Sequence, residues 1–132
     1  MINFTFNEVF NMYNVLTNIK SNSFKVNYWI SRNLKLFKDT YIFILNERNK
    51  IYSEFLVADN KGLYFDMVGE DIYKPHYKDE NPEYIKKFAD KMEDLFGTDC
   101  QFDPYLIHPS VLMELDLSIS LDQLMTIDKL FE

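Results

Sequence analysis

The longest regular pattern of apolar positions lies between Asn27 and Phe55. Apolar side chains recur there at intervals that alternate between four and three residues, the spacing of one face of an α-helix. No glycine or proline interrupts the chain between Asn22 and Gly62. The pattern predicts one long helix from Asn27 to Phe55, and its heptad spacing is also typical of helices that self-associate. The seam consists of Ile30, Leu34, Phe37, Tyr41, Ile44, Arg48, Ile51 and Phe55.

Arg48 stands at a seam position where an apolar residue is expected, and two interpretations of it stay open. Its side chain can extend from the edge of the seam to water, or pair with an acid on a facing helix. Alternatively, one polar seam residue can set the register of a self-associating coiled coil. The sequence alone does not decide between them.

A shorter helix is predicted near the start of the chain. Thr5 and Glu8 have the spacing of a capping box, in which each side chain accepts a hydrogen bond from the backbone N–H of the other residue. Phe4 and Val9 have the spacing of a hydrophobic staple around this cap. The apolar positions that follow predict a helix that continues to about Lys20.

Two more short helices are marked by their end signals. Pro82 suits a first helical turn with Asn81 as its cap, and Gly97 suits the end of the same helix. Near the end of the chain, Ser120 and Gln123 form a second capping box. The apolar positions after it predict a short amphipathic terminal helix.

Strand signals are weaker and are grouped around one turn. The stretch Asp59–Gly62 has turn composition and lies between Phe55–Ala58 and Leu63–Val68, which predicts a β-hairpin. Gly69–Asn81 is expected to be a loop, and residues 100–107 are expected to be extended. The predicted fold class is therefore α+β and mainly helical, with a long central helix, shorter helices and a small β-hairpin.

Composition bounds the class of protein. The chain has 132 residues, of which 47% are hydrophobic and 27% charged, which predicts a single globular domain over residues 1–132. Acids outnumber bases by 21 to 14, so the net charge is −7, and direct binding of nucleic acid is not expected. No apolar run is long enough to span a membrane and no secretory signal is present, so the expected location is the cytoplasm.

Candidate chemistry is sparse. The single cysteine, Cys100, lies between Asp99 and Asp103, and nearby carboxylates raise the pKa of a thiol, so Cys100 is not expected to be a nucleophile. Two histidines and one cysteine provide no zinc-ligand spacing, and the three glycines form no phosphate-binding loop. The sequence therefore predicts no enzyme, no metal and no cofactor, although its 21 carboxylates leave a catalytic pair possible without nominating one.

One basic stretch is a candidate nucleic-acid site. Lys25, Arg32, Lys35 and Lys38 lie on or before the long helix, near Tyr28 and Trp29. Residues 28, 32 and 35 share one helical face, and basic residues beside aromatic rings can hold a single strand. Because the chain is acidic overall, we interpret this stretch as a solvated basic face.

Residues 63–84 form an acidic-aromatic segment, in which tyrosines alternate with carboxylates. Aromatic side chains are common interface anchors, and acids direct a protein towards basic surfaces. The sequence predicts that this segment binds a partner protein with a basic surface; alternatively, its tyrosines pack on the helices while its acids face water. The predicted contact residues are Tyr64, Asp66, Glu70, Asp71, Tyr73, Tyr77, Asp79, Glu80 and Glu83.

Three stretches together carry a family resemblance: Phe24–Leu36, Asn46–Lys50 and Ile119–Leu124. The chain resembles an uncharacterised family of small proteins from tailed phages of low-GC Gram-positive bacteria. This resemblance implies a phage origin, no catalytic motif and action inside the host cell, where small acidic phage proteins often inhibit host machinery.

Two functions follow as hypotheses. The first is a non-enzymatic inhibitor of a host defence or nucleic-acid-handling complex, similar to an anti-CRISPR protein, that covers a basic groove of a host protein. The alternative is a helical scaffold protein of a phage that forms a homodimer through the seam.

Overall fold

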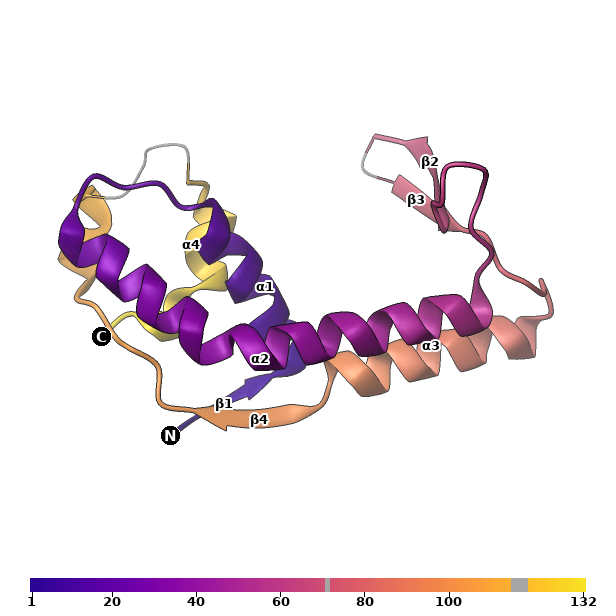
Figure 1. Ribbon diagram of the computed structural model, residues 1–132, viewed down its shortest axis with the longest axis horizontal. Helices are drawn as coiled ribbons and strands as arrows, with labels where there is room; N and C mark the ends of the chain where they lie inside the picture. Colours follow the sequence, from indigo (N-terminus) through magenta and orange to yellow (C-terminus); the bar gives the residue numbers. More distant parts are fainter. Residues whose placement is uncertain (71, 115–118) are drawn as a thin grey trace. The chain divides into compact units, whose positions relative to one another are not determined.

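The computed structural model describes residues 1–70, 72–114 and 119–132, and its fold is α+β (Figure 1). The prediction of a mainly helical chain with a long central helix is confirmed. In chain order, the elements are β1 (Ile2–Thr5), α1 (Phe6–Asn18), α2 (Phe24–Phe55), β2 (Phe65–Gly69), β3 (Ile72–Pro75), α3 (Pro82–Phe96), β4 (Asp99–Phe102), α4 (Leu121–Thr126) and two 3-10 turns, Pro109–Glu114 and Asp128–Leu130.

The chain divides into two compact units. Unit 1 consists of residues 1–44 and 97–132, and unit 2 consists of residues 45–96. Helix α2 contributes its first part to unit 1 and its last part to unit 2. Each unit has buried hydrophobic residues of its own, and the expected single domain stays a prediction.

Unit 1 begins with a short strand that the sequence analysis did not predict. Strand β1 pairs antiparallel with β4, with Ile2 opposite Phe102 and Thr5 opposite Asp99 (Figure 1). Thr5 ends the strand and also caps α1: its hydroxyl accepts the Glu8 N–H at 3.1 Å, and the Glu8 carboxylate accepts the Thr5 N–H at 3.0 Å. The predicted capping box is thus confirmed, and the expected extended segment near residue 100 is β4.

Aromatic rings fill the core of unit 1. Phe4 from β1, Phe37 from α2 and Phe102 from β4 meet edge to face, with ring centroids 4.9–6.2 Å apart. At the other end of the same part of α2, the indole ring of Trp29 lies 5.3 Å from the ring of Phe131. Its N–H donates to the Leu130 carbonyl at 3.2 Å. Residues from both ends of the chain therefore close this core around α2.

Unit 2 corrects the predicted hairpin. Helix α2 continues to Phe55, and the Leu56 N–H still donates to the Tyr52 carbonyl at 2.8 Å. Leu56 then bridges to Tyr77, whereas the prediction paired it with the stretch after the turn. The observed hairpin joins β2 to β3, and β3 lies in the stretch expected to be a loop. The Asp59–Gly62 turn itself is present, with Gly62 in the left-handed region at φ 77°.

The end signals of the other helices are confirmed. The Asn81 side chain accepts the Glu83 N–H at 2.9 Å at the start of α3, and α3 ends one residue before Gly97. Ser120 and Gln123 form the second capping box around the start of α4. The terminal helix is shorter than its apolar pattern suggested, because the chain turns into a 3-10 turn at Asp128–Leu130.

Candidate protein-binding surface

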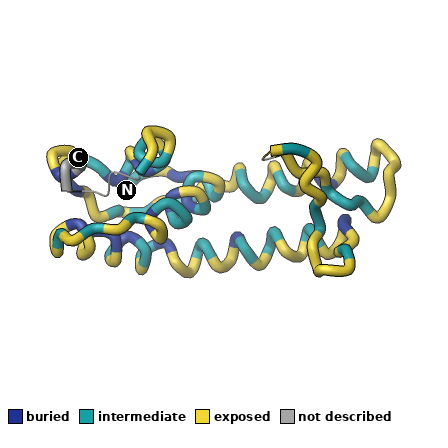
Figure 2. The backbone as a smooth tube through the Cα atoms, turned by 90° about the horizontal axis from the view of Figure 1, so that it is seen from above, coloured by how far each residue is buried: buried dark blue, intermediate teal, exposed yellow. Residues whose placement is uncertain are grey.

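The seam residues of α2 are covered, fully or in part, by other residues of the same chain. None of these eight residues is exposed: Ile30, Phe37, Ile44 and Phe55 are buried, and the other four are half-buried (Figure 2). In unit 1, the Tyr41 ring stacks on the Tyr13 ring at 4.1 Å, and its hydroxyl donates to the Asn14 side chain at 2.9 Å. Self-association through the seam stays a prediction.

Arg48 lies at the side of the seam in unit 2. Its guanidinium stands over the Tyr52 ring, 5.1 Å from the centroid, and donates to the Asn49 side chain at 3.3 Å. A cation is attracted to the face of an aromatic ring, so this contact stabilises the Arg48 charge within the chain.

Two tyrosines of the acidic-aromatic segment belong to the core of unit 2. The Tyr77 ring packs edge to face on the Phe88 ring at 5.6 Å, and burial raises the pKa of Tyr77. The Tyr64 ring lies 5.9 Å from the Tyr52 ring, and its hydroxyl shares a 3.4 Å hydrogen bond with Ser53. Tyr64 and Tyr77 therefore stabilise the fold, as the alternative interpretation of the segment expects.

Two of its carboxylates also have local structural partners. Asp66 pairs with the His76 imidazole at 2.5 Å, and this hydrogen bond is the main reason that the pKa of His76 is raised. Asp79 accepts the Asn81 N–H at 2.8 Å and so shapes the turn into α3. Both carboxylates remain exposed, as do Glu70, Tyr73, Glu80 and Glu83, and Asp71 lies outside the described residues.

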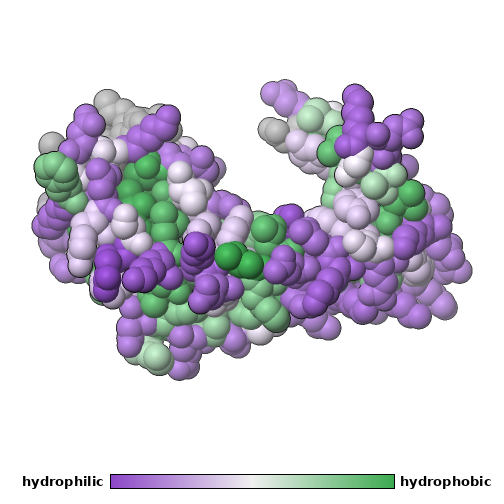
Figure 3. Space-filling model, viewed as in Figure 1, coloured by the Kyte–Doolittle hydropathy of each residue, from purple (hydrophilic) through white to green (hydrophobic). Residues whose placement is uncertain are grey.

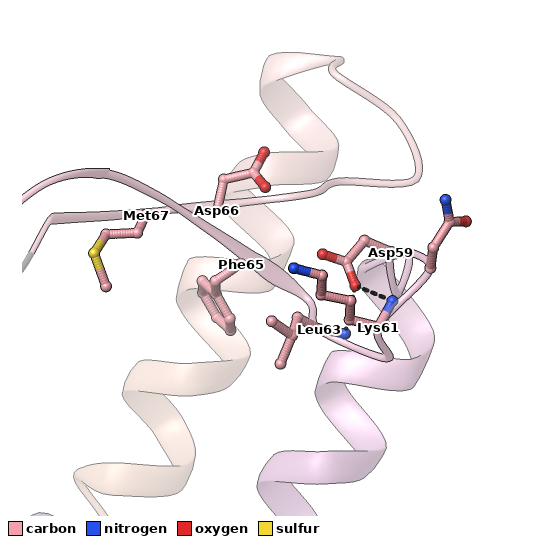
Figure 4. A pocket seen from close by; sticks show the side chains of 7 residues that line it. Asp59, Lys61, Leu63, Phe65, Asp66 and Met67 are labelled. Carbon is pink, nitrogen blue, oxygen red and sulfur yellow. Dashed lines mark hydrogen bonds between the residues drawn. The ribbon is translucent and has the colours of Figure 1, made fainter.

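The β2–β3 hairpin has one apolar and one polar face. The register places Phe65 opposite Pro75 and Met67 opposite Tyr73, so these four side chains share one face of the hairpin. Asp66 points to the other side of the strand from Met67 (Figure 4).

The apolar face extends beyond the core that supports it. The Phe65 ring packs on Tyr52 at 5.3 Å, but Met67 is 66% exposed and Tyr73 is 56% exposed. The neighbouring Leu63, Val68 and Ile72 are exposed as well. Figure 3 shows apolar surface on this part of unit 2, bordered by hydrophilic residues. We call Phe65, Met67, Tyr73 and Pro75, together with the adjoining Leu63, the hairpin apolar face.

Two shallow depressions adjoin this face. The first, of about 390 Å³, is lined by Leu63, Tyr64, Phe65 and Tyr73. The second, of about 380 Å³, is lined by Asp59, Asn60, Lys61, Leu63, Phe65, Asp66 and Met67 (Figure 4). Both share Leu63 and Phe65, and charged side chains line only the second. The predicted contact residues did not include Leu63, Phe65 and Met67, although the predicted strand Leu63–Val68 contains all three.

Within residues 1–70, 72–114 and 119–132, no three histidine, cysteine or carboxylate side chains gather as metal ligands. Burial and the neighbouring Asp99 raise the pKa of Cys100 in unit 1, in the predicted direction, and its thiol donates to the Phe4 carbonyl at 3.4 Å.

Comparisons with models of protein families, with curated proteins and with solved structures return no match for this chain. Within the described parts of the chain, no helix combines the length and the apolar character that crossing a membrane requires.

Proposed function

We propose that this chain is a protein-binding module that contacts its partner through the hairpin apolar face. The observation that carries the proposal is the position of Met67 and Tyr73, which continue an apolar surface beyond the core of unit 2 into water. Exposed apolar surface bordered by polar residues is typical of interaction sites, and aromatic and methionine side chains are enriched at their centres.

The charge around this face supports a basic partner. The acidic-aromatic segment holds six acids and two bases, and one of these bases, Lys78, donates to the Ser53 carbonyl at 2.7 Å. Glu70, Glu80 and Glu83 are exposed to solvent. Opposite charges at the border of an interface raise the association rate and select the partner. The proposed partner therefore has an apolar patch bordered by lysine or arginine.

The proposed biological role is inhibition of a host protein in the host cytoplasm. Proteins of defence and nucleic-acid-handling complexes carry basic grooves because they bind polyanions. An acidic module that covers such a groove would exclude the nucleic acid. This part of the proposal rests on the net charge of −7 and on the resemblance to small phage proteins.

A matched pair of methionine variants tests the surface. The full chain, immobilised on beads, is incubated with a lysate of a low-GC Gram-positive bacterium, and captured proteins are identified by mass spectrometry. Met67→Lys places a charge in the hairpin apolar face, and Met125→Lys makes the same change on α4 at nearly the same exposure, 64% against 66%. We expect a partner whose capture falls at least tenfold with Met67→Lys and is unchanged by Met125→Lys. Equal capture by both variants contradicts the proposed surface.

A second pair tests the charge. Glu70→Lys reverses a carboxylate beside the hairpin, and Glu93→Lys reverses an exposed carboxylate on α3. We expect capture to weaken with rising salt, and Glu70→Lys to weaken it more than Glu93→Lys. A partner that is insensitive to both salt and Glu70→Lys contradicts the basic partner while leaving the apolar contact in place. Light scattering on the same samples shows whether the captured partner is a second copy of the chain.

A further inference from the structure

A second exposed surface, in unit 1, has the opposite charge. Between Glu8 and Asp39 the sequence contains no acid and five bases, in a chain of net charge −7. These bases are Lys20, Lys25, Arg32, Lys35 and Lys38. Most of them lie on the first part of α2, where the spacing of Tyr28, Arg32 and Lys35 places them on one helical face.

Arg32 lies between two tyrosine rings. Its guanidinium carbon is 4.7 Å from the centroid of Tyr105 and 5.9 Å from that of Tyr28. Its Nη2 donates to the Tyr105 hydroxyl at 2.6 Å. A depression of about 290 Å³ lies here, lined by Arg32, Lys35, Leu36 and Tyr105. We call Tyr28, Arg32, Lys35 and Tyr105 the basic-aromatic site.

A buried asparagine fixes this site in place. Asn33 is fully buried on α2, and its side-chain amide donates to the Tyr105 carbonyl at 2.8 Å. Its side-chain oxygen accepts the Tyr105 N–H at 3.0 Å. This two-sided contact holds the backbone of Tyr105 against the helix, although the Tyr105 residue is itself 40% exposed. The exposed ring is therefore positioned before any ligand arrives, which lowers the entropic cost of binding.

The positive charge of this site is not neutralised by the protein. In the parts of the chain that the structure describes, no ion pair involves Lys25, Lys35 or Arg32. The partner of Arg32 is a neutral phenol, and its Nε is buried without a hydrogen-bond partner. Asp103, the acid nearest to Tyr105 in sequence, pairs with the N-terminal amine at 3.1 Å. An anion at this site would thus meet cationic groups that have no acidic partner.

We propose that the basic-aromatic site binds a nucleotide, with the base on the tyrosine rings and the phosphate on Lys35 and Arg32. Base–aromatic stacking and contacts from basic side chains to phosphate are the two means by which proteins hold unpaired nucleotides. At physiological salt, charges more than about 8 Å away are largely screened, so a small ligand at this site is affected mainly by the charges next to it.

The test is a calorimetric titration of the full chain with four probes: thymidine monophosphate, thymidine, inorganic phosphate and a 5′-phosphorylated tetrathymidylate. We expect the monophosphate to bind at least fivefold more tightly than thymidine or phosphate. A tetranucleotide that binds more tightly than the monophosphate identifies a short single strand as the natural source. Equal affinity of the two identifies a free nucleotide.

Variants separate site-specific binding from general charge. Lys35→Glu should weaken monophosphate binding at least tenfold, whereas Lys87→Glu, the same change at an exposed position of α3, should weaken it less than twofold. Tyr28→Leu, at a residue 65% exposed, should abolish the preference for the monophosphate over inorganic phosphate. Three results each overturn the proposal: no saturable binding of either nucleotide, equal loss in both lysine variants, or inorganic phosphate that binds as tightly as the monophosphate. None of them bears on the hairpin apolar face.

Discussion

Replacing Asn33 by alanine removes the contact that holds the segment after β4 against α2. The variant loses both hydrogen bonds to the Tyr105 backbone and a third, at 3.1 Å, from its amide to the Trp29 carbonyl. Leaving a buried backbone donor or acceptor unpaired costs about 1–3 kcal/mol each. Two such groups at Tyr105, partly reached by water, give about 3 kcal/mol, and the better helix propensity of alanine returns at most about 0.7 kcal/mol. The expected net loss in the free energy of unfolding is about 2–3 kcal/mol.

Urea unfolding, followed by tryptophan fluorescence, measures this loss in the unit that contains Asn33. Trp29 is the only tryptophan and lies in the core of unit 1, one helical turn before Asn33. With a urea dependence of about 1–3 kcal/mol per M, the midpoint should fall by roughly 1 M or more. Asn11→Ala, at an exposed position of α1, is the matched control and should leave the midpoint nearly unchanged. If both variants unfold within about 0.5 kcal/mol of each other, the reasoning about Asn33 is wrong.

Three further predictions concern single contacts. Thr5→Ala should lower the free energy of unfolding by about 1 kcal/mol because it removes the cap of α1, and Thr5→Ser should restore most of it in thermal unfolding. Because the pKa of His76 is raised above its unfolded value mainly by Asp66, with Asp59 contributing, their pairing stabilises unit 2 fully below pH about 6.5. This stabilisation is lost as the pH rises through the higher folded pKa, so the amides of β2 and β3 should exchange faster over that range. If amide exchange in Asp66→Asn depends on pH in the same way as in the original chain, this prediction is wrong. Cys100 should react with iodoacetamide at least tenfold more slowly in the folded chain than in urea, because burial raises its pKa; equal rates would show that the thiol is accessible.

Features fixed by neighbouring residues were predictable from the sequence. Both capping boxes need only residues three apart, and the structure contains both. Helix α3 was likewise predicted with its observed start at Pro82. Helix α2, in contrast, begins three residues before the predicted Asn27, where the Ser23 hydroxyl accepts the Val26 N–H at 3.3 Å. Its first residue, Phe24, is 92% exposed and does not belong to the apolar face whose spacing predicts the helix.

Pairings between distant residues were not predictable in the same way. Strand β1 finds its partner, β4, almost a hundred residues later. The alternation of apolar and polar residues in β1 favours a strand, but it does not indicate which segment pairs with it. The hairpin was misplaced because Leu56 and Val57 have strand composition. They do form backbone bridges, but to residues 76–78 instead of the stretch directly after the turn.

The acidic-aromatic segment contains both core residues and exposed residues, and the sequence did not separate the two. Tyrosine is equally suited to an interface and to a core, and composition cannot distinguish the two uses. Tyr77 became a core residue because α3 brings Phe88 against it, whereas Tyr73 stayed exposed because nothing in the described chain covers that side of β3. The core role of Tyr77 and the exposed position of Tyr73 can be distinguished only when the pairing of β2 with β3 is known.

The closure of unit 1 by β4 and by the last residues of the chain has a consequence for synthesis on the ribosome. Trp29 emerges early, but the carbonyl of Leu130 and the ring of Phe131 that complete its surroundings come about a hundred residues later. At about 5–20 residues per second, the first part of α2 waits roughly 5–20 s for them. Unit 2, continuous in sequence, has all of its residues well before that. During this interval the apolar side of α1 and α2 lacks its final cover, which makes the nascent chain a natural client for chaperones.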